Sequence, residues 1–215
     1  MSEKLREFLA SATRRAQLLR LDETQPWGLS ALRGRFVEVS ARGATATLTA
    51  AIELVIEAQR DGEPVAWITG SSGSFYPPDV ADSGVDLAAL VVVRDCAPGS
   101  ARLLKAAERL LRSGGFGLVV LDLGGPDNAS VEIPIAHQGR LVTLAQAHDA
   151  AIVCITEKTE DASSIGSLVS LRTEASRTGV LGSRDGFEVK LRVLKDKRRG
   201  PGWTRTSKAR GPAGT

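Results

Sequence analysis

The sequence predicts an α/β fold built on one mostly parallel sheet with helices on its faces. Up to residue 155, short apolar runs rich in Val, Ile and Leu alternate with longer segments of helical periodicity, as is typical of parallel strands joined by crossover helices. After residue 155, two segments alternate apolar and polar residues with a period of two, which indicates antiparallel, half-exposed strands near the C-terminus. A chain of 215 residues with 42% hydrophobic residues can bury one substantial core.

The first predicted element is an amphipathic helix that precedes the core. Leu5, Phe8, Leu9 and Ala12 recur at helical spacing and give it one apolar face. This face is either a docking site for a partner protein or an arm packed on the chain's own core, and the sequence favours neither. We assign the helix and a connector to residues 1–28, the core to 29–194 and a C-terminal tail to 195–215.

The next segments read as strand, tight turn, helix and strand. GRFVEVS predicts the first strand, residues 47–60 a helix with a glycine just past its end, and PVAWIT the second strand. The turn at 40–47 therefore lies where a phosphate-binding loop of the form G-x-x-x-x-G-K-[ST] would lie. It keeps Gly43 and the hydroxyls of Thr45 and Thr47, but it has no lysine.

The remaining core elements continue the alternation. AALVVVR is the third predicted strand, residues 100–114 form a helix with Ser100 as its N-cap, and FGLVVLD is a buried strand that ends in an acid. A helix at 136–147 leads into the buried strand AAIVCIT, and LVSLRTEAS and FEVKLRVLK predict the antiparallel pair. In such sheets ligands bind at the carboxyl ends of the strands. Four polar side chains should meet at this edge: Ser40, Thr69, Asp122 and Thr156.

Charge is distributed unevenly along the chain. Residues 195–215 carry seven basic residues and one acid, a net charge of +6, so that the total of +3 leaves −3 for the preceding residues. A short basic segment on a slightly acidic body is typical of binding to a phosphate backbone, although such tails also serve solvation or partner binding. Trp203 could stack on an unpaired base or anchor packing. The predicted DNA-binding residues are Lys195, Lys197, Arg198, Arg199, Trp203, Arg205, Lys208 and Arg210.

Several classes of protein are disfavoured by the composition. The apolar runs are far shorter than the roughly 20 residues that span a bilayer, and the N-terminus lacks the apolar region of a secretory signal, so we expect a cytoplasmic protein without membrane contact. Cys96 and Cys154 have no metal or disulfide spacing, and Cys154 should be a buried thiol. His137 and His148 are not at ligand spacing, so no metal site is predicted.

The order of these segments resembles the core of the RecA recombinase family over roughly residues 29–203. GRFVEVS matches the strand before the phosphate loop, FGLVVLD the second nucleotide motif, AIVCITEK the strand before the second DNA-binding loop, and FEVKLRVLKDKRRGP the late strands. The resemblance implies a RecA-like fold of the P-loop NTPase type with a degenerate phosphate loop. It also implies a degenerate nucleotide site in which ATP and Mg²⁺ would be held weakly, if at all, by Arg42, Gly43, Thr45, Thr47 and Asp122.

Three departures from the family pattern argue against turnover. The phosphate-loop lysine is missing, with Thr45 or Ala46 nearest its position, and the catalytic Glu position falls on Gly70 or Ser71. The segment in place of the second DNA-binding loop, EKTEDASS, is short and acidic. We therefore predict no catalytic residue.

A small RecA-like chain with these losses resembles the ImuA family, the accessory proteins of bacterial mutagenesis cassettes. The segments SGVDLAALVVVR and AAERLLRSGGFGLVVLDL also carry this resemblance. It implies a role in error-prone translesion synthesis after DNA damage, with ImuB, RecA and an error-prone DnaE-type polymerase as partners and DNA as an auxiliary ligand. The alternatives are a weak DNA-stimulated ATPase, or a regulator of RecA filaments or of cell division in the SOS response.

Overall fold

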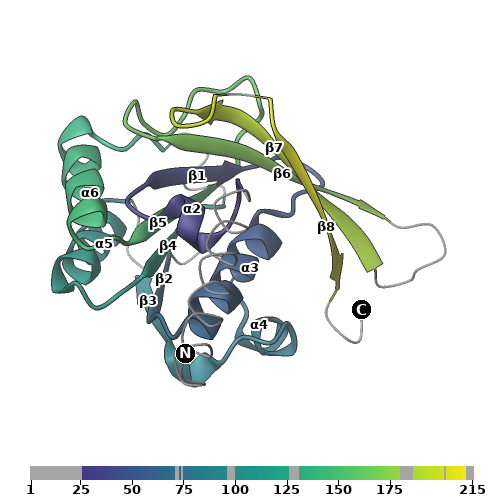
Figure 1. Ribbon diagram of the computed structural model, residues 1–215, viewed down its shortest axis with the longest axis horizontal. Helices are drawn as coiled ribbons and strands as arrows, with labels where there is room; N and C mark the ends of the chain where they lie inside the picture. Colours follow the sequence, from purple (N-terminus) through teal and green to yellow (C-terminus); the bar gives the residue numbers. More distant parts are fainter. Residues whose placement is uncertain are drawn as a thin grey trace, which may run out of the picture.

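A computed structural model describes residues 26–70, 73, 75–95, 100–125, 131–179, 186–200 and 202–211. The predicted docking residues Leu5, Phe8, Leu9 and Ala12 lie outside this part of the chain. The described strands form one sheet in the order β3-β2-β4-β5-β1-β6-β7-β8 (Figure 1). They are β1 Phe36–Ser40, β2 Val65–Gly70, β3 Leu90–Asp95, β4 Leu118–Asp122, β5 Ala151–Thr156, β6 Leu171–Gly179, β7 Gly186–Asp196 and β8 Thr204–Arg210. The helices are α2 Leu29–Leu32, α3 Thr47–Arg60, α4 Pro77–Asp82, the 3₁₀ turn η1 Leu87–Ala89, α5 Ala101–Ser113 and α6 Ile135–Ala147.

The predicted α/β architecture with a mostly parallel sheet is confirmed. Strands β1 to β6 pair in parallel, whereas β7 pairs antiparallel with both β6 and β8. Every residue of β1, β4 and β5 is buried, as expected for central strands covered on both faces. Cys154 is among them, and burial, followed by the nearby charge of Glu38, raises the pKa of its thiol.

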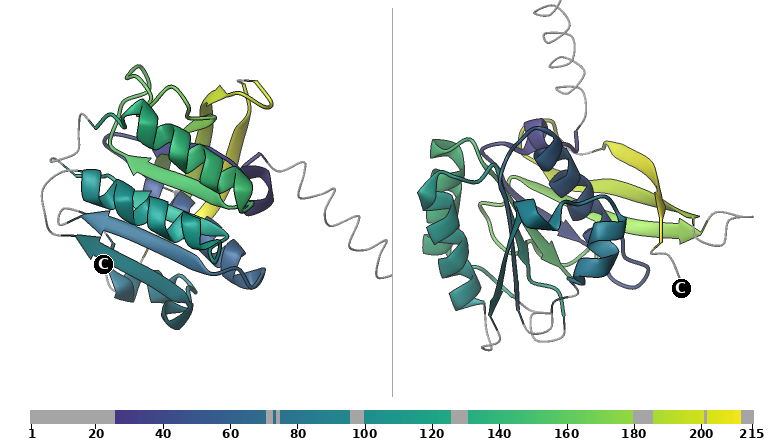
Figure 2. Two further views of the ribbon diagram at one scale, coloured as in Figure 1. Left: turned by 90° about the vertical axis from the view of Figure 1, so that its left-hand side faces the viewer. Right: turned by 90° about the horizontal axis from the view of Figure 1, so that it is seen from below.

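Helices cover both faces of the parallel part of the sheet and create two apolar cores (Figure 2). One core lies beneath α2 and α3 and includes Trp67 and Phe75, whose ring centroids are 5.1 Å apart. The other core lies beneath α5 and α6. The central strands are therefore fixed from both sides, and only their ends and the outer strands can meet a ligand.

The ends of α3 and α5 lie where the sequence predicts them. Gly62 after α3 and Gly114 after α5 have φ values of +75° and +68°, which glycine adopts without a steric penalty. Ser100 is the N-cap residue of α5, as predicted, but its side chain makes no capping hydrogen bond. Its backbone is already helical, at φ −78° and ψ −14°, whereas a capping residue needs an extended conformation.

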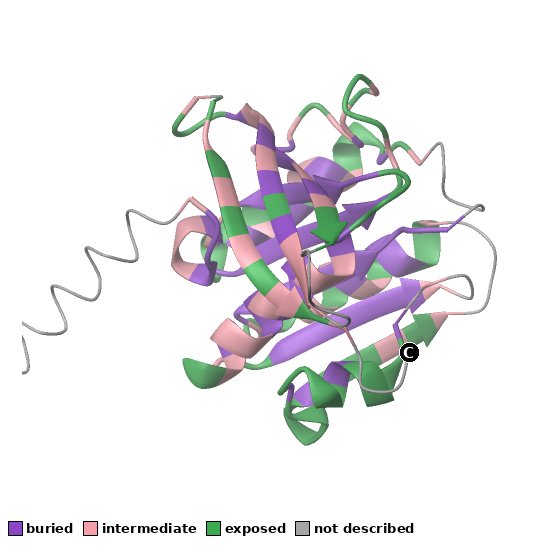
Figure 3. Cartoon of the chain, turned by 90° about the vertical axis from the view of Figure 1, so that its right-hand side faces the viewer, coloured by how far each residue is buried: buried purple, intermediate pink, exposed green. Residues whose placement is uncertain are grey.

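The segment expected to be a separate basic tail belongs to the sheet. Its first two residues end β7, and 204–210 form β8, so the expected boundary at 194 falls inside a strand. Exposed and half-buried residues alternate along β8 (Figure 3). The half-buried positions are Arg205, Ser207 and Ala209, and because none of them is a large apolar residue, the period-two pattern is hard to recognise in the sequence.

Candidate functional site

The four polar residues predicted to meet at the carboxyl edge of the sheet do lie on neighbouring strands. Ser40 is opposite Thr156, and Thr69 is opposite Asp122. The Thr69 hydroxyl donates to the buried Asp122 carboxylate over 3.3 Å, and the Gly124 amide donates to its other oxygen over 3.1 Å. Strand β5 separates β1 from β4, so Ser40 and Asp122 are two strand spacings apart, roughly 10 Å.

The turn between β1 and α3 is paired with strand β6 through its backbone. The Ala46 amide donates to the Ala175 carbonyl over 2.9 Å, and the Arg177 amide donates to the Ala44 carbonyl over 3.0 Å. Thr45 forms an isolated antiparallel bridge with Ser176. The turn therefore extends the sheet for a short distance and does not form a loop whose backbone amides all point at one ligand.

The hydroxyl groups of this turn also have partners within it. The Thr45 and Thr47 hydroxyls are 3.0 Å apart, and the Thr47 amide donates to the Thr45 hydroxyl over 3.2 Å. The Thr45 amide donates to the Gly43 carbonyl over 2.9 Å. This arrangement stabilises the start of α3, which is a common structural role of Ser and Thr at helix ends.

These contacts do not fit a bound nucleotide. A phosphate loop binds through backbone amides that point at the phosphates, together with a lysine and a hydroxyl on the metal. Here the amides of Thr45, Ala46 and Thr47 already donate to protein oxygens. No lysine follows them, and Asp122 is bonded to Thr69 on the far side of β5. The predicted nucleotide residues thus share one edge of the sheet without forming one site.

Arg42, the remaining predicted nucleotide residue, is exposed and lines a pocket of about 270 Å³. Its charged neighbours there are Glu132, Glu157 and Lys158. Two carboxylates beside two cations leave no net positive charge for a triphosphate.

A buried carboxylate that sequence reasoning did not single out organises this edge. Glu38 in β1 is fully buried, and its Oε1 accepts a hydrogen bond of 3.0 Å from the Thr156 hydroxyl. Its Oε2 accepts from the Ser164 hydroxyl at 2.8 Å and from the Ile165 amide at 3.0 Å. Arg172 forms an ion pair with it at 3.7 Å. The loop after β5 is therefore tied to the central strand.

Arg172, the second residue of β6, holds the same loop from the other side. Its guanidinium donates to the carbonyls of Thr159 and Ala162, and only 5% of its side chain is exposed. Glu160 in this loop forms an ion pair with Arg192 of β7. The short acidic loop at 157–164 is thus anchored, and its negative charge is in part neutralised. A charge inside each apolar strand, as in FVEVS and SLRTE, is the signal that points to this network.

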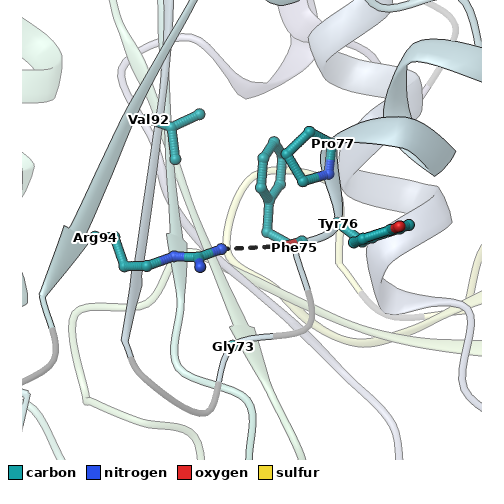
Figure 4. A pocket seen from close by; sticks show the side chains of 6 residues that line it. All are labelled: Gly73, Phe75, Tyr76, Pro77, Val92 and Arg94. Carbon is teal, nitrogen blue, oxygen red and sulfur yellow. Dashed lines mark hydrogen bonds between the residues drawn. The ribbon is translucent and has the colours of Figure 1, made fainter.

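An apolar surface lies along β3, which is the edge strand on the side of the sheet away from β8. An open pocket of about 630 Å³ is lined there by Gly73, Phe75, Tyr76, Pro77, Val92 and Arg94 (Figure 4). The Arg94 guanidinium donates to the Phe75 carbonyl over 3.3 Å. Tyr76 is 59% exposed, and Val91 and Val92 are 45% and 41% exposed. We call this group of residues the β3 edge surface.

The predicted DNA-binding residues are not brought together. Lys195, Lys197, Arg198 and Arg199 lie at the amino edge of the parallel sheet, because Asp196 is opposite Leu171, the first residue of β6. Lys208 and Arg210 lie toward the other end of β8, where Arg210 is opposite the first residue of β7.

Two of the predicted DNA-binding residues, Arg205 and Trp203, make contacts that stabilise the fold. Arg205 forms an ion pair of 2.7 Å with Glu53 of α3. The indole N–H of Trp203 donates to Asp196 over 3.2 Å, and its ring packs against the core beneath α3. The geometry therefore favours Trp203 as a packing anchor over a platform for base stacking.

Among the residues that the structure describes, no helix combines the length and apolar character needed to cross a membrane, and no cluster of three His, Cys, Asp or Glu residues could hold a metal ion. A scan against protein-family models and a search of curated proteins find no match for this chain.

Proposed function

We propose that this chain is a RecA-like accessory protein of the ImuA type, which acts in the cytoplasm through protein contacts in translesion DNA synthesis. The observation that supports a role without nucleotide hydrolysis is the pairing of the 40–47 turn with β6. Amides that would bind phosphates donate instead to Gly43, Ala175 and the Thr45 hydroxyl. ImuB, RecA and a DnaE-type polymerase are the partners that the family resemblance suggests.

The contrast between the two edges of the sheet supports protein contact. Edge strands normally carry charges that discourage pairing with other chains. Strand β8 follows this rule, with exposed Lys208 and Arg210. The middle of β3, in contrast, exposes Val91 and Val92 beside the pocket. Such an apolar edge suits a partner that adds an extended segment to the sheet.

The test is a charge placed on the β3 edge surface. Val92→Lys should weaken binding to purified ImuB or RecA by tenfold or more, because an edge lysine opposes strand addition and fills the pocket mouth. Thr206→Lys, on the exposed face of β8, is the matched control and should bind as the wild type does. Calorimetric titration of each variant against each partner gives the comparison.

Two outcomes would contradict the proposal. Equal affinities for the two lysine variants would remove the β3 edge surface from it. Failure of the wild type to bind ImuB, RecA and the DnaE-type polymerase would remove the accessory role itself.

The alternative of a weak DNA-stimulated ATPase draws on the position of Asp122, which lies at the carboxyl edge of the sheet beside Thr69. In that mechanism Arg42 would take the place of the missing lysine. ATP turnover that Asp122→Ala abolishes in a highly purified sample would decide for this alternative.

A further inference from the structure

The end of β7 and the turn that follows it carry four cations within five residues. Lys195, Lys197, Arg198 and Arg199 surround Asp196, and the last three cations are exposed. We call residues 195–200 the basic turn. It lies at the amino edge of the sheet, opposite the edge that holds the 40–47 turn.

The acid within the basic turn does not neutralise these cations, because it faces inward. The Asp196 side chain is fully buried and accepts a hydrogen bond of 2.6 Å from Arg35, whose own side chain is 2% exposed. It also accepts from the Arg198 amide at 2.9 Å and from the Trp203 indole at 3.2 Å. Asp196 thus balances a buried arginine and fixes the shape of the turn.

Neutral acceptors hold several of the cationic side chains in place. The ammonium groups of Lys197 and Lys195 donate to the Ser167 carbonyl over 2.9 Å and 3.5 Å. The Arg198 guanidinium donates to the Arg33 carbonyl over 3.4 Å. Because a carbonyl carries no net charge, these contacts position the cations without cancelling their positive charge.

The cations of this region also repel one another. Burial lowers the pKa of Lys195, the charges of Lys197 and Arg172 lower it further, and the charge of Glu38 opposes the shift. Burial likewise lowers the pKa of Arg35, where Asp196 opposes the shift and Arg198 and Arg199 add to it. A bound polyanion would relieve this repulsion.

We propose that the basic turn binds the phosphate backbone of nucleic acid at the amino edge of the sheet. The proposal narrows the DNA contact predicted from the sequence to one turn, and it does not depend on any partner protein. The turn has no apolar residue that could enter a membrane. Since the Trp203 ring packs against the core, it is not available to stack on a base, and the basic turn presents only cations to the ligand. We therefore expect binding through phosphates, with little dependence on base sequence.

Paired charge variants of the full chain test this site. Lys197→Gln with Arg199→Gln removes two charges from the basic turn, and Lys208→Gln with Arg210→Gln removes two from the far end of β8. Anisotropy of a labelled mixed-sequence duplex is measured over a range of salt concentrations. The first variant should bind about tenfold more weakly at low salt, with a salt slope flatter by about 2, since each lost phosphate contact removes about 0.9 from the slope. The second should match the wild type.

Three outcomes would overturn the proposal. Equal losses in the two double variants would indicate diffuse attraction without a site, and a wild type that does not bind the duplex would exclude the ligand. Binding of polyglutamate as tight as binding of DNA would mean that the turn selects charge and not a phosphate backbone. Val92→Lys should keep full DNA binding, so a failure of the partner proposal is distinguished from a failure of this one.

Discussion

At the scale of single residues, the buried pair of Arg35 and Asp196 joins the residue before β1 to the end of β7. Removing the charge of Asp196 leaves Arg35 without its counter-ion in the interior. Asp196→Asn should therefore lower the free energy of unfolding by about 3–5 kcal/mol, which is the usual cost of breaking a buried ion pair on one side. Urea denaturation measures the change.

Asp149→Asn is the matched control for this substitution. The Asp149 side chain is 77% exposed and lies 3.9 Å from Arg33, so its loss should cost at most about 1 kcal/mol. A similar loss in the free energy of unfolding for both variants would mean that the buried Arg35–Asp196 pair contributes no more to stability than an exposed pair.

The same pair predicts a dependence on pH. Burial raises the pKa of Asp196, but hydrogen bonds from the Arg198 amide, Arg35 and Trp203 outweigh this and leave it below its ordinary value. A carboxyl whose folded-state pKa is depressed stabilises the protein fully above its unfolded-state pKa, about 3.9, and loses this contribution as the pH falls through the folded-state value. The difference between the wild type and Asp196→Asn should thus be constant near neutral pH and shrink below about pH 4. A difference that grows on acidification would contradict the assignment.

At the scale of elements, the turn before α3 explains why restoring one residue would not restore a nucleotide site. Thr45 is exposed, so Thr45→Lys can be accommodated, and it removes the Thr45 partner of the Thr47 amide and hydroxyl. The Ala46 amide would still donate to Ala175 of β6. We expect this variant to show no saturable binding of a fluorescent ATP analogue with Mg²⁺, as the wild type should also show none. Saturable binding by the variant alone would indicate that the lysine was the missing part.

The sequence predicted most elements well because their local patterns are strong. The α3 boundaries, the buried strands β4 and β5 and the glycine stops all depend on neighbouring residues. Strand β8 was missed because its pairing with β7 is a tertiary contact and its inward side chains are polar.

For the candidate site, the position of Thr69 and Asp122 at the carboxyl ends of parallel strands was enough to predict that they meet. The pairing of the 40–47 turn with β6 could not be predicted, because the Ala46 amide and the Ala44 carbonyl bond to residues more than a hundred positions away. The same holds for the contacts of Glu38 with the loop after β5, which join distant parts of the chain.

At the scale of the whole molecule, the sheet keeps the proposed protein-binding surface and the proposed DNA-binding turn apart. The apolar β3 edge surface and the basic turn lie on different strands and differ in chemistry. A partner protein on β3 would leave the amino edge of β6 and β7 accessible. The proposed protein and DNA contacts are therefore compatible, and a complex of the protein, its partner and a duplex is geometrically possible.

The sheet also determines how the C-terminal segment must be tested. Deleting residues 195–215 removes more than charge, because it takes away the Asp196 partner of Arg35, the Arg205 partner of Glu53 and all of β8. We expect the shortened chain to lose its cooperative thermal transition, since Arg35 would lose its buried counter-ion and one edge of β7 would lose its hydrogen-bonded neighbour.

A chain that ends at Arg210 is the control for this deletion, because it keeps β8 and every ion pair named above. It should melt as the full chain does in circular dichroism. If the chain ending at residue 194 also melted normally, β8 and Asp196 would be dispensable for the fold, and the segment would be the independent tail that its composition suggests. If it unfolds, any loss of DNA binding on deletion reports the loss of the sheet. Only the paired glutamine variants then separate the charge of the basic turn from its structure.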